Sequence, residues 1–421
     1  MTGEPRRVTR RQFLTGAGIV ATAAVAGGYG VSVWTRDAPT TKKQARTVAH
    51  GDPRGTLVVV ELGGGNDALN MVVPNDPAYR ALRPTLGVSD PIHLDDETGL
   101  HPKLVKLAER YRRGQVAIVE GVGYPDPNLS HFASLATWWS AHPGGSLDTG
   151  WLGRYLDATV GFDDPLALVA IGPTPSPAVL GERSFATSIA DATGLTPRLP
   201  AWADRASDVV AAWRGFAPAP VDPVTLTERV DDALRLTVSA RDELRATLGT
   251  GGAPAASDVG AAPGGALVDE LELAGRLVAG RRRPRVVYVS GTGDFDTHQG
   301  EATRHPALMA DLDTGIDRLF TAAGPAGKDL LVMTVSEFGR RPAENGSGTD
   351  HGTAAAHLLV GSSVRGGRHG ARPSLARLDQ HGNPVATVDF RALYASVLRD
   401  WLHADPEPVL DGAFGGLRVV A

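Results

Sequence analysis

The sequence predicts an α/β fold, in which helices cover both faces of a central, mostly parallel sheet. Several short runs are too continuously apolar for half-exposed strands and fit central strands buried on both faces. Segments with the spacing of amphipathic helices separate these runs, as expected for parallel strands joined by helical crossovers. The predicted strands are 56–62, 115–122, 166–171, 285–290, 329–335 and 357–360, and the predicted helices include 102–113, 306–320 and 390–403.

The composition excludes several classes of protein. The chain has 421 residues, with 42 Lys and Arg against 47 Asp and Glu, so it carries no broad basic surface for nucleic acid. It contains no cysteine, which excludes disulfides, thiolate ligands and cysteine nucleophiles. Any metal ion must therefore be held by histidine, carboxylate, hydroxyl or carbonyl groups.

The first 35 residues predict an export signal that does not belong to the fold. A twin-arginine pattern, Thr9 to Leu14, precedes an uncharged Gly/Ala/Val-rich stretch that reaches about Trp34. Ala24-Val25-Ala26 fits a cleavage site, although the stretch approaches the length of a membrane span and could instead be retained as an anchor. We expect export by the twin-arginine translocase to a periplasmic, cell-envelope or secreted location.

The remaining chain divides into a linker and one large domain. Residues 36–54 are polar and unpatterned, which is typical of a linker, and the α/β domain is predicted to span 55–421. Within it, residues 198–280 are rich in Ala, Arg, Asp and Leu and include a predicted helix over 223–248. We interpret this block as a helical insertion that lies over the α/β core.

The stretch after the predicted strand 285–290 reads GTGDFDTHQGE and presents Asp294, Asp296 and His298. Carboxylate oxygens and imidazole nitrogens this close together suit zinc, manganese or a similar divalent ion. Either aspartate could act with His298, and both stay open at this stage. Two or three donors do not complete a site, so other segments must supply the rest.

Other predicted strands also lead into groups that can bind metal. Strand 56–62 runs through three glycines to Asp67, strand 329–335 to Glu337, and Asp350 and His351 follow closely. Asp67 could equally cap the next helix. Because the carboxyl ends of strands converge on one crevice in a doubly wound sheet, the recurrence predicts a shared metal site.

A serine and two arginines add candidate groups. Ser130 is predicted at the start of a helix, where free amides stabilise negative charge on a nucleophile or anion, although serine is also a favoured N-cap. Arg340 and Arg341 follow strand 329–335 and could bind an anionic substrate, or form surface ion pairs.

A series of motifs carries a family resemblance over nearly the whole exported chain. In order, the motifs are LGGGNDALNMVVP, NLSHF, GWLGRYLD, DFDTHQGE, VSEFGRR and GTDHGTAAAHLLVG. Behind a twin-arginine leader, this series resembles the domain-of-unknown-function family 1501. That family is similar to the alkaline phosphatase and sulfatase superfamily, whose members generally hold two divalent metals near a serine, threonine or formylglycine nucleophile.

The resemblance implies roles for particular residues. It implies Asp67 as a ligand after the first strand, Ser130 as the nucleophile, and Asp296 with His298 as an Asp and His ligand pair. Glu337 would replace an aspartate ligand, and His351 would be the last histidine ligand, beside Asp350. The chain departs from the pattern at Phe338, which stands where the enzymes have a ligating histidine. Either His131 or Asp350 replaces that donor, or the protein binds only one ion.

The leading hypothesis is an exported hydrolase of phosphate or sulfate esters that depends on one or two divalent ions. Ser130 would attack a small anionic ester in line, assisted by Arg340 and the metal site. The alternative, which Phe338 favours, is a non-catalytic cell-envelope protein that keeps a metal for stability and binds a partner or polysaccharide.

Overall fold

The computed structural model describes most of the predicted α/β domain. The described residues are 55–144, 148–160, 164–182, 184, 186–189, 226–248, 265–291 and 293–421, with strand Ser32–Val33 and a few single positions between 205 and 215. The twin-arginine motif, the Ala24-Val25-Ala26 motif and the whole of the predicted linker, 36–54, lie outside this set. Among the described residues, no helix is both long enough and apolar enough to cross a bilayer.

The described part of the chain forms one large sheet of ten strands. Nine follow the order β1-β8-β7-β9-β2-β10-β13-β6-β14, and β15 also pairs with β6. Neighbours from β8 to β10 are all parallel, whereas β13 is antiparallel to both β10 and β6, which confirms a mostly parallel sheet. In that order the strands are Ser32–Val33 (β1), Thr187–Ile189 (β8), Leu168–Ile171 (β7), Val286–Val289 (β9), Thr56–Glu61 (β2), Leu330–Val335 (β10), Ala355–Val360 (β13), Val116–Gly123 (β6), Gly367–His369 (β14) and Val388–Asp389 (β15).

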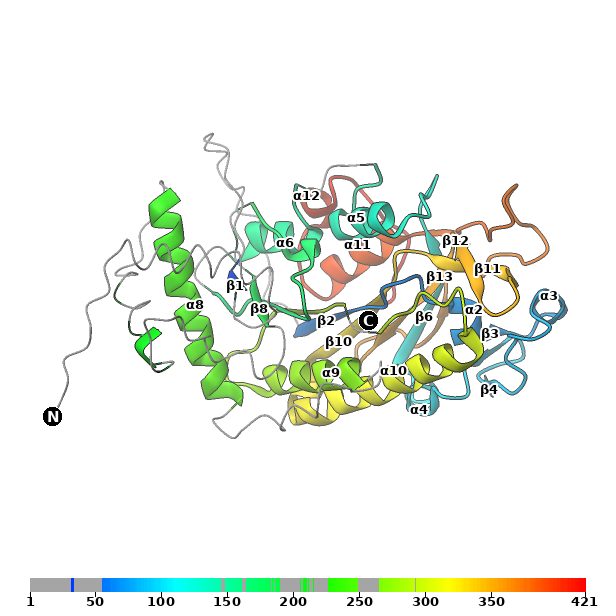
Figure 1. Ribbon diagram of the computed structural model, residues 1–421, viewed down its shortest axis with the longest axis horizontal. Coiled ribbons are helices and arrows are strands. Elements are labelled where there is room, and N and C mark those ends of the chain that lie inside the picture. Colours follow the sequence, from blue (N-terminus) through cyan, green and yellow to red (C-terminus); the bar gives the residue numbers. More distant parts are fainter. Residues whose placement is uncertain are drawn as a thin grey trace.

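Helices cover both faces of this sheet, as Figure 1 shows. Alternate residues of β2 enter opposite cores: Val58 and Val60 pack into one, and Leu57 and Val59 into the other. The first core is closed by α4 (Val105–Arg112), α9 (Gly265–Ala279) and α10 (Glu301–Ala323). The second is closed by α5 (His131–Ser140), α6 (Trp151–Thr159), α11 (Phe390–Asp400) and α12 (Pro406–Leu410). Strands buried on both faces explain why the sequence shows continuous apolar runs.

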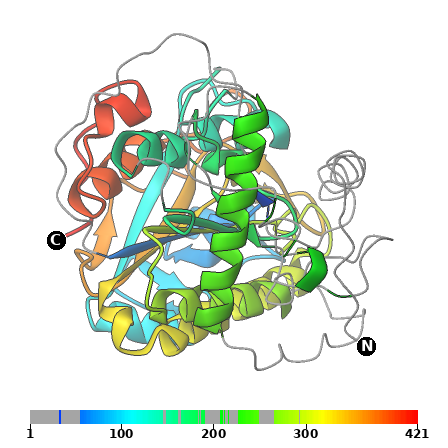
Figure 2. The same cartoon turned by 90° about the vertical axis from the view of Figure 1, so that its left-hand side faces the viewer.

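Among the described residues, the long helices α8 (Leu226–Leu248) and α9 fall within the range predicted as a helical insertion. The first, α8, stands across the end of the molecule where β1 and β8 form the sheet edge (Figures 1 and 2). The second, α9, runs beside α10 and buries Leu267 and Leu271 in the core beneath the sheet. It is therefore part of the covering helical layer. The boundaries of the insertion stay a prediction, because much of 198–264 lies outside the described residues.

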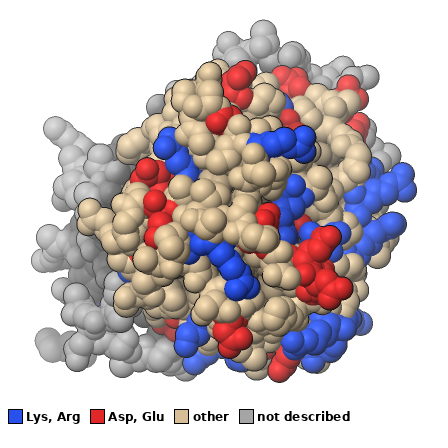
Figure 3. Space-filling view, turned by 90° about the vertical axis from the view of Figure 1, so that its right-hand side faces the viewer, with Lys and Arg blue, Asp and Glu red and all other residues tan. Residues whose placement is uncertain are grey.

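Smaller elements surround one end of the large sheet. A second sheet pairs β3 (Val72–Pro74), β5 (Thr98–Leu100) and β4 (Ile92–His93), and a hairpin pairs β11 (Gly339–Glu344) with β12 (Thr349–Gly352). Short helices α2 (Ala68–Met71) and α3 (Pro77–Leu82) lie beside them, with 3-10 turns at Pro177–Val179 and Gly324–Asp329 elsewhere. Figure 3 faces this end, where basic and acidic side chains are interspersed over the described surface.

The parallel register aligns the ends of three central strands. Val60 of β2 pairs with Val289 of β9, and Glu61 pairs with Val335 of β10. The loops that follow β2, β9 and β10 therefore leave the sheet at the same edge. These loops contain Asp67, Asp296 and Glu337, and the convergence expected from the sequence is confirmed at the level of the backbone.

Candidate metal centre

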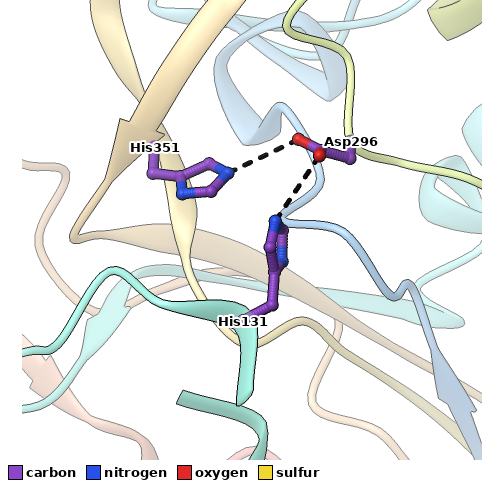
Figure 4. A group of neighbouring side chains, drawn as sticks. All are labelled: His131, Asp296 and His351. Carbon is purple, nitrogen blue, oxygen red and sulfur yellow. Dashed lines mark hydrogen bonds and ion pairs between the residues drawn. The ribbon is translucent and has the colours of Figure 1, made fainter. Parts of the chain in front are cut away.

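Three histidine side chains converge on the carboxylate of Asp296. Nε2 of His298 and Nε2 of His351 each lie 3.4 Å from its Oδ1, and Nε2 of His131 lies 3.5 Å from its Oδ2. Figure 4 shows His131 and His351 approaching Asp296 from two different segments. The donor atoms of these three residues all lie within 4.8 Å of one another. We call His131, Asp296, His298 and His351 the metal centre.

The second ring nitrogen of each histidine is held by another group. Nδ1 of His131 lies 2.8 Å from Oε1 of Glu337, and Nδ1 of His298 lies 3.4 Å from Oδ1 of Asp350. Nδ1 of His351 lies 2.9 Å from the Leu129 carbonyl, which can only accept, so this nitrogen carries a proton. Metal-binding histidines in proteins are typically oriented in this way, with the far nitrogen held and the near one free to ligate.

The spacing of these donors fits a divalent ion. Ligands at about 2.0–2.1 Å from a tetrahedral zinc ion stand about 3.3–3.4 Å apart. Nε2 of His298 and Nε2 of His351 each lie 3.4 Å from Oδ1 of Asp296, close to that value, and Nε2 of His131 lies 3.5 Å from the other oxygen, Oδ2. The Nε2 atoms of His298 and His351 are closer, at 2.9 Å. His131, Asp296 and His351 offer donor atoms that are mutually close enough to share zinc or a similar ion, and His298 contacts this group through Asp296 and His351, so the residues present fit a bound metal.

Backbone geometry brings the loop after β2 against Asp296. Gly64 has φ +113°, and a Cβ built on it would lie 2.4 Å from the backbone nitrogen of Asp296. The amide of Gly64 also donates to Oε1 of Glu337 at 2.8 Å. Only glycine allows this conformation and this close approach, which explains why glycines follow the strand.

Arg340 lies beneath the centre and is almost completely buried. It donates to the carbonyls of Gly65 at 2.6 Å and Thr349 at 2.7 Å, and to Oδ1 of Asp296 at 2.6 Å. All three of its nitrogens have partners, so the side chain holds neighbouring loops together and orients Asp296. Nothing in this geometry presents Arg340 to a substrate, as its predicted catalytic role would require.

Hydrogen bonds, burial and nearby charges shift the pKa values of residues in the metal centre. The hydrogen bond to Glu337 raises the pKa of His131. Burial lowers the pKa of His351. Burial acts to raise the pKa of Asp296, but hydrogen bonding and charge from Arg340 outweigh it and lower that pKa. Asp296 is therefore held as a carboxylate, and His351 as a neutral imidazole at neutral pH, which are the forms that bind metal.

Asp67 does not join the centre. Its side chain is fully buried, forms a salt bridge with Arg83 through both oxygens, and accepts from the amide of Leu69 at 3.2 Å as the N-cap of α2. Burial acts to raise the pKa of Asp67, but the charge of Arg83, together with hydrogen bonds to Glu301 and Arg83 and the charge of His305, outweighs it and lowers that pKa. The structure thus shows the helix cap that the sequence left open as the alternative to a ligand.

The structure distinguishes the two aspartates that the sequence left open. The carboxylate of Asp294 is largely exposed and pairs with Arg304 at 2.6 Å, away from His298. Asp296 is the member that faces the histidines. The predicted ligands Glu337 and Asp350 contact ring nitrogens of His131 and His298, so they stand behind the histidines and orient them.

Ser130 lies beside the centre at the N-cap of α5. Its hydroxyl makes no capping hydrogen bond, and its side chain is exposed. The residue before it, Leu129, accepts from His351, and the residue after it is His131. Leu129 and His131 therefore place the backbone of Ser130 next to the centre, at the end of a helix whose dipole stabilises negative charge.

Phe338 forms an apolar wall against the centre. It is 2% exposed, and its ring centroid lies 4.3 Å from that of His351 and 5.0 Å from that of His131.

His131 is a member of the centre that the sequence offers only as a replacement donor and not among the predicted ligands. The signal for it was its position next to Ser130, at the start of a helix that follows strand β6.

No curated protein matches the chain. Among solved structures, it is similar to a protein in the alkaline phosphatase superfamily from Vibrio parahaemolyticus, with 9% identity, a TM-score of 0.36, and coverage of 96% of this chain and 78% of that one. It is also similar to alkaline phosphatase from the Antarctic bacterium TAB5, with 9% identity, a TM-score of 0.31, and coverage of 74% of this chain and 93% of that one. A third similar structure is the soluble domain of lipooligosaccharide phosphoethanolamine transferase A from Neisseria meningitidis. It has 12% identity and a TM-score of 0.32, with coverage of 79% of this chain and 80% of that one.

The sequence also matches a family model. The model, described as a protein of unknown function (DUF1501), covers residues 116–401, which include every member of the metal centre. The match spans more than half of the chain and confirms the resemblance carried by the motifs. The chain belongs to the DUF1501 family.

Proposed function

We propose that this protein is a metal-dependent hydrolase of phosphate or sulfate esters, with Ser130 as its nucleophile. The observation that carries the proposal is the convergence of three imidazole Nε2 atoms on Asp296, with the uncapped Ser130 hydroxyl next to His131. A divalent ion bound there would favour the ionised form of a nearby hydroxyl and offset charge that develops on the ester.

The residues of the chain have separate tasks in this proposal. His131, His298, His351 and Asp296 would hold the ion, while Glu337, Asp350 and the Leu129 carbonyl keep the imidazoles oriented. Ser130 would lose its proton to solvent and attack the phosphorus or sulfur as the bond to the alcohol oxygen breaks and the alcohol departs; water would then hydrolyse the seryl ester, releasing phosphate or sulfate and restoring the serine. The amino end of α5 stabilises negative charge on the serine oxygen and on the anion.

Two features favour a single ion over two. Asp67, the expected ligand after the first strand, is neutralised by Arg83, whose guanidinium supplies the positive charge that its carboxylate requires. Phe338 stands where a further histidine ligand was expected and offers only ring carbons. We therefore propose a mononuclear centre.

The cellular setting of the proposal rests on the leader sequence. The twin-arginine pattern from Thr9 to Leu14 supports export by the twin-arginine translocase, which carries proteins already folded. A metal ion could then be loaded before export. We propose a periplasmic, cell-envelope or secreted enzyme, with a small anionic ester as its substrate, and contact with the membrane only if the leader is retained.

The test is hydrolysis of a panel of aryl phosphates and aryl sulfates by the exported protein. Ser130→Ala and Asp296→Ala should each abolish most of the activity, whereas Ser89→Ala, at an exposed serine outside the centre, should match the wild type. If Ser130→Ala and Asp296→Ala leave all measurable hydrolysis unchanged, the proposed mechanism is wrong.

A second candidate function is a metal-stabilised envelope protein without turnover. The buried ring of Phe338 favours it, because that ring occupies space beside the centre without contributing chemistry. Metal analysis of protein purified without added metal, together with the hydrolysis panel, separates the candidates. One equivalent of metal with turnover supports the hydrolase, and one equivalent without turnover supports the binding protein. No metal, with stability insensitive to chelator, removes both.

A further inference from the structure

A large cavity opens beside the metal centre. Its volume is about 1130 Å³, and it lies between the segment 123–129 and the segment 379–389. Three of its lining residues are close in sequence to the centre: Leu129, whose carbonyl holds His351, Thr353, and Arg341, which follows Arg340. The cavity is far larger than a phosphate or sulfate ion, and its size is that of a site for an organic molecule.

Arg341 differs from its neighbour in having no partner for its charge. The side chain of Arg341 makes no hydrogen bond or ion pair with the described residues, and its Nε is buried and unsatisfied. The hydrogen bond from Asn345, together with the charges of His298 and Arg341, lowers the pKa of Asp350, but this carboxylate bonds to Asn345 and His298 and forms no ion pair with Arg341 among the described residues. A partly buried guanidinium without a counter-ion is unfavourable, and an anion beside it would be stabilised.

The acidic groups that line the cavity do not supply that counter-ion. The carboxylate of Asp379 accepts from the amides of His381 and Asn383 and from the Asn383 side chain. Asp389 pairs with Arg391 and caps α11. Asp126 is exposed and solvated, so its effect is screened by water. The charge of Arg341 is therefore left for a ligand.

We propose that this cavity holds the alcohol portion of the substrate, and that Arg341 pairs with a second anionic group on that portion. The inference rests on the proposed hydrolase and specifies its substrate class. The substrate is an organic phosphate or sulfate ester whose alcohol carries a carboxylate or another acid. The metal centre takes the transferred group, and Arg341 selects for the second charge.

Binding of the alcohol products tests the inference without any turnover. The probes are 4-hydroxybenzoate and 8-hydroxyoctanoate, each compared with its uncharged counterpart, phenol or 1-octanol, by titration calorimetry on the full chain as purified. The wild type should prefer at least one charged probe to its counterpart. Arg341→Ala should reduce that preference about tenfold or more, because a charge-assisted contact is lost.

Two further variants make the result interpretable. Arg341→Lys keeps a positive charge but loses the guanidinium fork, so it should retain part of the preference. Arg377→Ala, at an exposed arginine that does not line the cavity, should behave as the wild type. Equal thermal unfolding of the variants shows that a lost preference is not lost folding.

Two outcomes overturn the inference. The first is that the wild type prefers neither charged probe, or that Arg341→Ala keeps the wild-type preference. The second is a special case of an unchanged preference: if Arg341→Ala also weakens binding of inorganic phosphate, Arg341 contacts the transferred group and not the alcohol portion. The hydrolase proposal fails by a different result. In that case the wild-type protein binds the charged probes but hydrolyses neither phosphate nor sulfate esters.

Discussion

Nδ1 of His131 lies 2.8 Å from Oε1 of Glu337, a carboxylate whose side chain has no exposed surface. The same oxygen accepts from the amide of Gly64 in the loop after β2. This contact joins the start of α5 to the ends of two central strands. It turns the remaining nitrogen of His131 towards Asp296, and it makes Glu337 a positioning residue for the metal centre.

Replacing Glu337 by glutamine should weaken metal binding. The variant keeps the size of the side chain but removes the negative charge that orients and polarises His131. We expect metal affinity to fall about 10–100-fold, as is typical when a group behind a histidine ligand is altered. Metal titration monitored by calorimetry measures this, with Glu272→Gln, at a surface ion pair with Arg318, as the control. An unchanged affinity would show that Glu337 does not support the centre.

Asp296 and Asp294 offer a matched pair of substitutions two residues apart. Asp296→Asn should remove most of the bound metal, because the three histidines converge on this carboxylate. Asp294→Asn should leave the metal content unchanged, since its exposed carboxylate pairs with Arg304. Elemental analysis of the two purified variants decides the matter. The reverse pattern would mean that the loop after β9 is arranged differently in the metal-bound protein.

The salt bridge between Arg83 and Asp67 should matter for stability and not for metal. Arg83→Met leaves the Asp67 carboxylate buried without its counter-charge, which should cost about 3–5 kcal/mol in the free energy of unfolding. Adding Asp67→Asn should recover part of that loss. Denaturant unfolding measures both effects. Loss of metal from the single variant Asp67→Asn would instead make Asp67 a ligand.

His357 should make the protein less stable in acid. It lies in β13, fully buried beside Trp138, with neither ring nitrogen hydrogen-bonded, and burial lowers its pKa to about 3. An unfolded histidine titrates near 6.5. Between these two pH values His357 is protonated in the unfolded state but not in the folded state. The contribution of neutral His357 to the free energy of unfolding is therefore fully present above pH 6.5 and is lost as the pH falls towards 3.

The substitution His357→Leu isolates that contribution from those of other groups. The variant should gain stability relative to the wild type as the pH is lowered from 7 to 4, because leucine has no proton to bind. Thermal or denaturant unfolding at several pH values gives the difference. A pH-independent difference for His357→Leu would refute the assignment.

Much of the fold follows from local patterns in the sequence. The apolar runs 56–62, 115–122 and 329–335 became β2, β6 and β10, and the helical spacing over 306–320 became part of α10. Period and burial are local properties, so they can be recognised without a structure. The packing of the helices in the range 198–280 does not follow from such patterns. Apolar spacing shows that α9 has a buried face, but not which surface covers that face.

For the candidate site, the sequence by itself determined which chemistry was available and which loops would carry it. With no cysteine in the chain and acids and histidines after its strands, a centre of imidazole and carboxylate ligands was predictable. Only the tertiary structure decided which members face one another. It grouped His131 with Asp296, His298 and His351, and paired Asp67 with Arg83. It also buried Arg340, whereas Arg341 has no counter-ion within the described part of the chain. The physical reason is that side-chain direction and competing charges come from segments distant in sequence, which no local pattern encodes.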